Sequence, residues 1–223
     1  MPSLVILLER CARLVSEASA GRRRVLGIAG PPGAGKTTLV ATLLRAAAAD
    51  PRLAGRVAHV PMDGFHLPGA ELQRLGRLGR KGAPDTFDVE AYAAVLAAVR
   101  ASPRAVVRAP AFDHGVGEPE AEAIEVGSGA DLVVTEGNYL LLDDPAWRPV
   151  RGLLDEVWFC ALPGDERRRR LIDRHVESGR PPQEATAWVD RSDEANARLV
   201  VGGHEAADLV LVDGRIVAKP ATR

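Results

Sequence analysis

A glycine-rich segment near the N-terminus constrains this chain more than any other feature. An apolar run from Val25 leads into Gly30-Pro31-Pro32-Gly33-Ala34-Gly35-Lys36-Thr37-Thr38, which fits the spacing G-x-x-x-x-G-K-[ST] of a phosphate-binding loop. Glycine lets the backbone turn its N–H groups around a phosphate, and the helix that follows directs the positive end of its dipole at the anion. The segment predicts binding of a nucleoside triphosphate by residues 30–38, between a strand and a helix.

Two side chains of this loop have roles set by their chemistry. Lys36 can reach the β- and γ-phosphates, and the Thr37 hydroxyl can ligate Mg²⁺. A glycine-rich turn that binds nothing is the plain alternative. The complete spacing after a strand pattern favours the nucleotide site.

Length and composition limit the remaining possibilities. The 223 residues suffice for one domain, 1–223, and the net charge of −1 gives no support for a nucleic-acid or anionic-membrane partner. Cys11 and Cys160 form no motif and suit a reducing compartment. The apolar run 4–8 is too short to span a membrane. We therefore expect a cytoplasmic protein without a membrane partner; the oligomeric state is left open, a homodimer included.

Strand and helix patterns alternate along the chain, which predicts a three-layer α/β fold with a mainly parallel sheet. Residues 67–84 form an irregular excursion, and residues 120–126 alternate as in an edge strand or hairpin. Asp213-Gly214 favours a hairpin turn near the end. The predicted strands are 25–29, 57–60, 105–109, 131–137, 157–162 and 209–212, and the predicted helices are 4–15, 38–49, 89–100, 163–182 and 185–201.

Acidic side chains follow two of the predicted strands. Asp63 comes just after strand 57–60, and Glu136 lies at the tip of the buried run 131–137. Ligands of open α/β sheets bind at the carboxyl ends of the strands. Asp63 can accept the proton of an attacking hydroxyl, help to hold Mg²⁺, or only cap a turn. Glu136 fits the second acidic element that holds Mg²⁺ in phosphate-loop enzymes.

An arginine-rich helix follows strand 157–162. Arg167, Arg170 and Arg174 are spaced by three and four residues, which predicts that they share one helical face. Guanidinium groups on one face can close over transferring phosphates and stabilise developing charge. The segment 163–182 is therefore predicted to be a helical lid, although charge runs are usually solvated faces.

Taken together, these motifs resemble the uridine kinase, pantothenate kinase and phosphoribulokinase group, especially its small bacterial members described as nucleoside/nucleotide kinase-like or fructokinase-like. The resemblance covers residues 25–211 and its two most specific elements are Asp63-Gly64-Phe65-His66 and Glu136-Gly137. The other matching motifs are the phosphate loop, Arg80-Lys81-Gly82-Ala83-Pro84 with Phe87-Asp88, Phe112-Asp113-His114, Asn138-Tyr139 and the arginine helix.

The resemblance implies a role for each matching residue. It makes Asp63 the general base, which also lies near the metal, and places Thr37 and Glu136 around Mg²⁺. Lys36, Arg170 and Arg174 become catalytic, and Arg167 joins residues 30–38 in binding ATP. The acceptor pocket is implied to consist of Arg80, Lys81, Asp113, His114 and Tyr139.

The expected activity is transfer of the γ-phosphoryl group of ATP to a hydroxyl of a small polar metabolite: a nucleoside, a pantothenate-like compound or a sugar. His175 stands where uridine kinases commonly have an acid, and the chain lacks the longer extension of bacterial pantothenate kinases, so the acceptor stays open. The alternative is a nucleotide hydrolase that acts as a switch on a partner protein.

Overall fold

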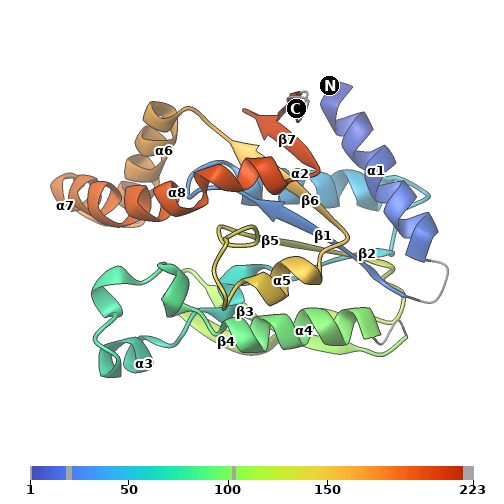
Figure 1. Ribbon diagram of the computed structural model, residues 1–223, viewed down its shortest axis with the longest axis horizontal. Helices are drawn as coiled ribbons and strands as arrows, with labels where there is room; N and C mark the ends of the chain where they lie inside the picture. Colours follow the sequence, from blue (N-terminus) through green and yellow to red (C-terminus); the bar gives the residue numbers. More distant parts are fainter. Residues whose placement is uncertain (1, 19–21, 102–103, 218–223) are drawn as a thin grey trace.

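The central sheet separates two layers of helices (Figure 1). The computed structural model describes residues 2–18, 22–101 and 104–217. Five strands run parallel, and β8 pairs antiparallel with β7, as the sequence predicts. In spatial order the sheet contains β2 (Val57–His59), β5 (Leu132–Gly137), β1 (Arg24–Ala29), β6 (Glu156–Ala161), β7 (Leu209–Val212) and β8 (Arg215–Val217).

The strands are apolar on both faces because each face packs against its own helices. Val25 and Val133 belong to the core shared with α4 and α5, whereas Leu26 and Val134 belong to the core shared with α1 and α2. This alternation fixes the register of the sheet. The helices are α1 (Pro2–Ala18), α2 (Lys36–Ala49), α3 (Gly69–Arg74), α4 (Val89–Ala101), α5 (Arg148–Gly152), α6 (Gly164–Glu177), α7 (Pro182–Trp188) and α8 (Glu194–Val200).

A separate antiparallel hairpin carries the second polar cluster of the sequence. It consists of β3 (Val107–Asp113) and β4 (Glu118–Val126) and does not join the central sheet. The predicted strand 105–109 was therefore too short, because cross-strand pairing continues to Asp113 opposite Glu118. Asp113 and His114 consequently lie at the hairpin turn.

Two predicted segments are more complex than expected. The predicted helix 185–201 is interrupted by a π-helical segment, η4 (Val189–Asp193), between α7 and α8. The 3₁₀ segments of the whole chain are η1 (Met62–Phe65), η2 (Leu78–Arg80), η3 (Pro84–Thr86) and η5 (Val201–Ala206). The excursion 67–84 contains α3 and the 3₁₀ segment η2, and it ends where η3 begins.

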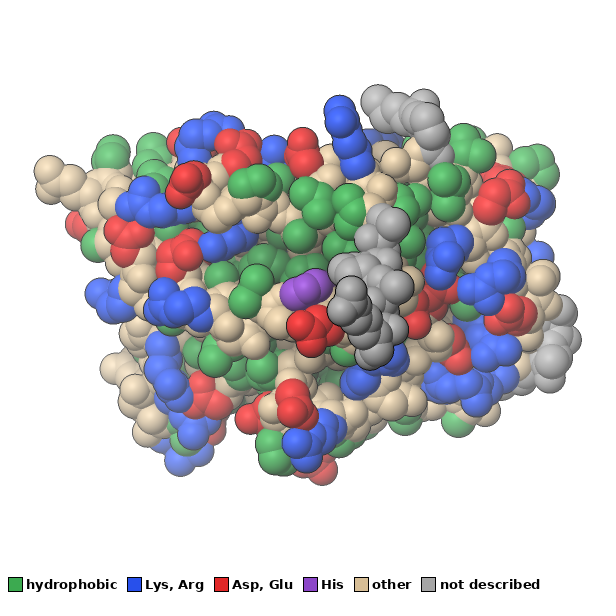
Figure 2. Space-filling model, turned by 45° about the horizontal axis from the view of Figure 1, so that its top comes forward, with side chains coloured by type: hydrophobic (Ala, Val, Ile, Leu, Met, Phe, Trp, Pro, Cys, Tyr) green, Lys and Arg blue, Asp and Glu red, His purple; other side chains and the backbone are tan. Residues whose placement is uncertain are grey.

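Two further features concern the charges on the surface and the apolarity of the helices. Positive and negative side chains are interspersed on the face seen in Figure 2, in keeping with the net charge of −1. Among the described residues, no helix has the length and apolarity needed to cross a membrane.

Candidate active site

The phosphate loop connects β1 to α2 at the carboxyl edge of the sheet. Gly30, Gly33 and Gly35 have φ angles of 146°, 76° and 86°, which side-chain-bearing residues rarely adopt. The N–H groups of Gly33, Gly35, Lys36 and Thr37 donate to no acceptor among the described residues. Nothing lies within 4 Å of a Cβ built on Gly35, so the space beside this glycine is open. The loop therefore fits a phosphate group.

Lys36 is held inside this loop by polar contacts. Its Nζ donates to Oδ1 of Asn138 at 2.6 Å and to the carbonyl of Pro31 at 3.1 Å. Burial lowers the pKa of Lys36, and the nearby charges of Glu136 and Asp63 act in the opposite direction. A bound phosphate would reinforce these negative charges and stabilise the ammonium form.

Thr37 and Glu136 bring oxygen atoms together beside the loop. Strand β1 pairs with β5 so that Ala29 lies opposite Gly137, which places Glu136 next to the loop. The Thr37 hydroxyl donates to Oε2 of Glu136 at 3.0 Å, and burial raises the pKa of Glu136. Hydroxyl and carboxylate oxygens fit Mg²⁺. The described residues contain no group of three or more His, Cys, Asp or Glu side chains placed to hold a metal ion, so phosphate and water oxygens would complete such a site.

Asp63 faces the same space from η1. Close packing of two glycines holds this segment, because a Cβ on Gly64 would lie 2.1 Å from the Pro110 carbonyl and one on Gly137 would lie 2.4 Å from Sδ of Met62. The half-buried Asp63 carboxylate has no hydrogen bond or ion pair within the described chain. Its charge nevertheless raises the pKa of both Lys36 and Glu136. Asp63 is thus an unpaired carboxylate close to the two groups of the nucleotide side.

His66, Lys81 and His114 lie around the ring of Phe112, whose centroid is 4.9 Å from that of His66, 5.2 Å from that of His114 and 5.3 Å from Nζ of Lys81. The His66 ring stacks on Phe87 at a centroid distance of 4.0 Å, and burial lowers its pKa to about 4. Lys81 and His114 both lower the pKa of His66 by their charge, whereas Asp63 raises it. Two of the predicted acceptor residues, Lys81 and His114, therefore lie near His66, which follows Asp63 by three residues.

Lys81 also has structural partners, because its Nζ donates to the Gly117 carbonyl at 2.6 Å and lies 3.7 Å from Oε1 of Glu118. The other three predicted acceptor residues are likewise engaged within the protein. Arg80 is exposed and forms an ion pair with Asp85. Asp113 accepts hydrogen bonds from the N–H groups of Gly115 and Val116 and so closes the hairpin turn. Tyr139 is fully buried and donates its hydroxyl proton to the Gly82 carbonyl at 2.5 Å. Packing in the core and the hydrogen bond to Gly82 therefore account for Tyr139 without any contact to a ligand.

The structure separates the three arginines predicted to share one face of α6. Arg167 is buried and donates to Glu194 at 2.6 Å and to the Pro32 carbonyl at 3.4 Å, which docks the helix on the phosphate loop. Arg170 pairs with Glu166 and reaches Asp213 at 3.5 Å. Arg174 forms no ion pair among the described residues, and its charge lowers the pKa of Lys36. Only Arg174 combines a free guanidinium with proximity to Lys36.

Two further site residues were given no role from the sequence, although Asn138 belongs to a motif named there. Asn138 accepts from Lys36, and its position directly after the Glu136 strand was a usable signal. His59 lies on β2 with Nε2 at 4.0 Å from Oε1 of Glu136, and that nitrogen is buried without a hydrogen-bond partner. The only signal for His59 is a polar residue inside an apolar strand.

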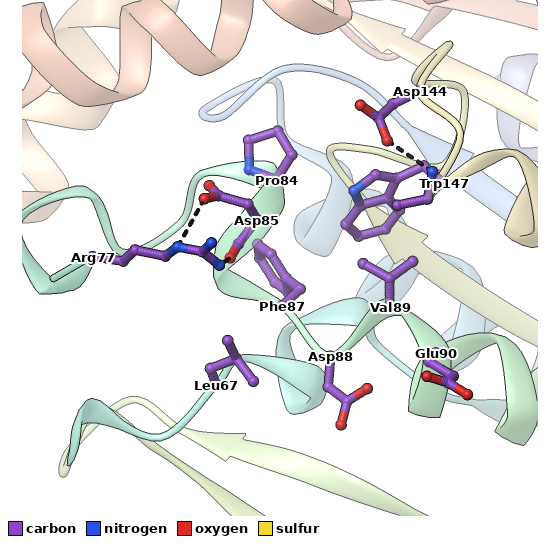
Figure 3. Close-up of a pocket in the computed structure, with 11 residues that line it drawn as sticks. Leu67, Arg77, Pro84, Asp85, Phe87, Asp88, Val89, Glu90, Asp144 and Trp147 are labelled. Carbon is purple, nitrogen blue, oxygen red and sulfur yellow. Dashed lines mark hydrogen bonds and ion pairs between the residues drawn. The ribbon is translucent and has the colours of Figure 1, made fainter. Parts of the chain in front are cut away.

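A cavity of about 400 Å³ lies beside Phe87, outside this cluster (Figure 3). Arg77 points across it toward Asp85, with 3.2 Å between Nε and Oδ2. Asp88 and Asp144 accept hydrogen bonds from the N–H groups of Ala91 and Ala146. Arg77, Asp85, Asp88 and Asp144 are thus engaged in local structure, and the phosphate loop and Asp63 do not line the cavity.

The geometry defines a phosphate-loop nucleotide-binding protein, and comparisons with known sequences and solved structures identify its relatives. Protein C227.14 of Schizosaccharomyces pombe, whose name places it with the uridine kinases, is 33% identical over 202 residues, which are 87% of this chain and 85% of that protein. Pantothenate kinase of Bacillus velezensis is 38% identical over 172 residues, 74% of this chain and 52% of the relative. A solved Silicibacter sp. TM1040 structure, designated a kinase of a fructose transport system, has a TM-score of 0.79 at 34% identity and covers 91% of this chain and 97% of its own.

No protein-family model matches the chain. The three relatives above are nevertheless all named as kinases, and they belong to one P-loop group. The chain belongs to the P-loop kinases of the uridine kinase and pantothenate kinase group, and its class of activity is phosphoryl transfer from a nucleotide to an alcohol.

Proposed function

We propose that this kinase transfers the γ-phosphoryl group of ATP to a hydroxyl group of a small polar metabolite, with Asp63 as the general base. The supporting observation is the unpaired Asp63 carboxylate, which acts electrostatically on Lys36 and Glu136. A carboxylate placed between a phosphate cradle and a polar pocket can take the proton of an acceptor hydroxyl.

Several residues of the site then take part in the chemical step. The acceptor oxygen bonds to the γ-phosphorus while its proton moves to a carboxylate oxygen of Asp63. The bond from that phosphorus to the oxygen shared with the β-phosphate breaks, and ADP leaves. Lys36 and Arg174 stabilise the charge that develops on the phosphoryl oxygens. Mg²⁺ held by Thr37 and Glu136 would neutralise charge on the β- and γ-phosphates when bound.

The test of this proposal compares Asp63→Asn with the wild-type enzyme. ADP release is measured with and without a panel of hydroxylated metabolites, and ATP affinity is measured by calorimetry. We expect an acceptor to stimulate the wild type, and Asp63→Asn to lower turnover by about 100-fold or more while ATP affinity stays similar.

Asp173→Asn is the matched control, because this exposed carboxylate contacts Arg169 on the outer side of α6. A variant at Asp63 that kept more than about a tenth of the activity would rule out the general base. Slow ADP release that no acceptor stimulates would instead favour the nucleotide-hydrolase alternative.

A further inference from the structure

Helix α6 is tied to the segments η4 and α8 near each of its two ends. In its first turn, Arg167 donates to Glu194 at 2.6 Å. In its last turn, Nε2 of His175 donates to Oδ2 of Asp193 at 2.9 Å. Figure 1 shows α6 beside α7 and α8 on the lid side of the molecule. The orientation of α6 therefore depends on two contacts that are about two helical turns apart.

The pair formed by His175 and Asp193 is largely shielded from water. Asp193 is 9% exposed, and the exposed fraction of the His175 side chain is 19%. Among the described residues, the Asp193 carboxylate has no other hydrogen bond or ion pair. A buried carboxylate without a partner is unfavourable, because it loses its water without a replacement. His175 and Asp193 therefore hold each other in one arrangement.

Arg174 lies at the end of the face of α6 that packs on the phosphate loop. Arg167, Leu171 and Arg174 are spaced by four and three residues, so they share one helical face. A Cβ on Gly33 would lie 2.8 Å from Cγ of Leu171 and 3.0 Å from Cγ of Arg167, so this face touches the loop. Burial lowers the pKa of Lys36, and the charge of Arg174 lowers it further. The Arg174 guanidinium is therefore on the nucleotide side of α6, directly before His175 in the chain.

We propose that His175 is a positioning residue for the kinase reaction: its hydrogen bond to Asp193 fixes the last turn of α6 and so directs Arg174 at the transferring phosphoryl group. This inference rests on the proposed function. An arginine side chain is long and flexible, so its guanidinium keeps one place only if the backbone that carries it is fixed. Helix α6 ends at Glu177, and Gly179 follows with a φ angle of 92°, so the hydrogen bond of His175 acts where the helix is about to end. A displacement of about 1 Å at a group that acts on the transition state can lower the rate by about 100-fold.

The first experiment compares two substitutions of His175 in the full-length protein. His175→Ala removes the donor, whereas the side-chain amide that His175→Gln introduces can donate in place of Nε2. ADP release is measured with the panel metabolite that stimulates the wild type most. We expect His175→Ala to lower kcat by about tenfold or more while KM for ATP changes by less than about threefold, and His175→Gln to recover most of the lost kcat. Asp193→Ala removes the other partner and should match His175→Ala.

A double substitution shows whether the effect passes through Arg174. Once Arg174→Ala has removed the guanidinium, His175→Ala should lower kcat by less than about twofold more, because no charge is left to misplace. Arg168→Gln is the matched control, since it breaks another tie between α6 and η4, the exposed pair with 2.7 Å between Nε of Arg168 and Oδ1 of Asp190. It should keep kcat within about twofold of the wild type. Thermal unfolding identifies any variant that is unfolded at the assay temperature, and His175→Leu, which keeps most of the buried volume, then replaces His175→Ala.

The outcomes separate this inference from the proposed function. A kcat for His175→Ala within about threefold of the wild type, or an equal loss of kcat with and without Arg174, would overturn the positioning role and leave the kinase proposal standing. If no metabolite stimulates ADP release from the wild type, the kinase proposal fails and the positioning role fails with it.

Discussion

The glycines of the phosphate loop share a left-handed backbone but differ in what surrounds them. A Cβ on Gly30 would lie 2.3 Å from the Cys160 carbonyl, which belongs to the neighbouring strand β6. A Cβ on Gly35 would meet no atom within 4 Å. Gly30 thus permits the strands to pack, whereas Gly35 keeps the phosphate space free.

This difference predicts opposite effects of two alanine substitutions. Gly30→Ala should lower the free energy of unfolding by more than about 2 kcal/mol, and Tm by about 4 °C or more, because backbone must move. Gly35→Ala should cost only about 1 kcal/mol but greatly weaken ATP binding, since its methyl group enters the cradle. Thermal unfolding and calorimetric titration with ATP measure the two effects. Normal ATP affinity in Gly35→Ala would contradict this interpretation of the loop.

The arginines of helix α6 differ in role: one holds the helix against the phosphate loop, and another is free to act on a bound phosphate. Arg167 anchors the helix to Glu194 and to the phosphate loop, so it serves the structure even without a nucleotide. Arg174 is left as the free cation near Lys36 among the three arginines considered. The spacing alone could not separate these roles, because the partners Glu194 and Asp213 come from distant segments.

The arginines of α6 should therefore differ when they are mutated. Arg174→Ala should lower kcat by about 100-fold, with less effect on ATP affinity, because it removes charge near the transferring phosphoryl group. Arg170→Ala should be milder, since Arg170 is already neutralised by Glu166. Steady-state kinetics of both variants provide the test. A larger loss in Arg170→Ala would show that the lid rearranges so that Arg170 replaces Arg174.

The sequence predicted elements well where local pattern determines them. Strands β1, β5 and β6 are continuous apolar runs because both faces of the sheet are covered, and the phosphate loop has a spacing of its own. The π-helical turn η4 and the hydrogen bond from Asn196 to Gly82, 114 residues apart, depend on tertiary packing. The acceptor side was predicted less fully, since loop conformations supply it.

The stability of the whole molecule should respond to pH through two half-buried histidines, His59 and His66. Burial lowers the pKa of His59 and of His66 from 6.5 to about 4. Between these values the unfolded chain binds protons that the folded chain does not, so the free energy of unfolding falls as pH falls from 6.5 toward 4. The raised pKa of Glu136 acts in the opposite direction. Each histidine contributes up to about 1.4 kcal/mol per pH unit in this window.

Urea unfolding at pH 7 and pH 5 checks this expectation. The wild type should lose stability between the two values, and His66→Gln should lose less, because its side chain does not titrate. His204→Gln is the control, because His204 lies on η5 and is not among the groups that shift the pKa of His66. An equal loss in wild type and His66→Gln would mean that His66 binds its proton in the folded protein as readily as in the unfolded chain.

The carbonyl oxygen of Gly82, in the segment 79–84, accepts hydrogen bonds both from the hydroxyl of Tyr139 and from Asn196 on α8. Helix α6 docks on the same region through Arg167 and Glu194, the first residue of α8. If the segment 79–84 or helix α8 moved alone, the hydrogen bond between Gly82 and Asn196 would be strained. If donor binding moves α6 and α8, thermodynamic linkage requires that donor and acceptor change each other's affinity by an equal factor.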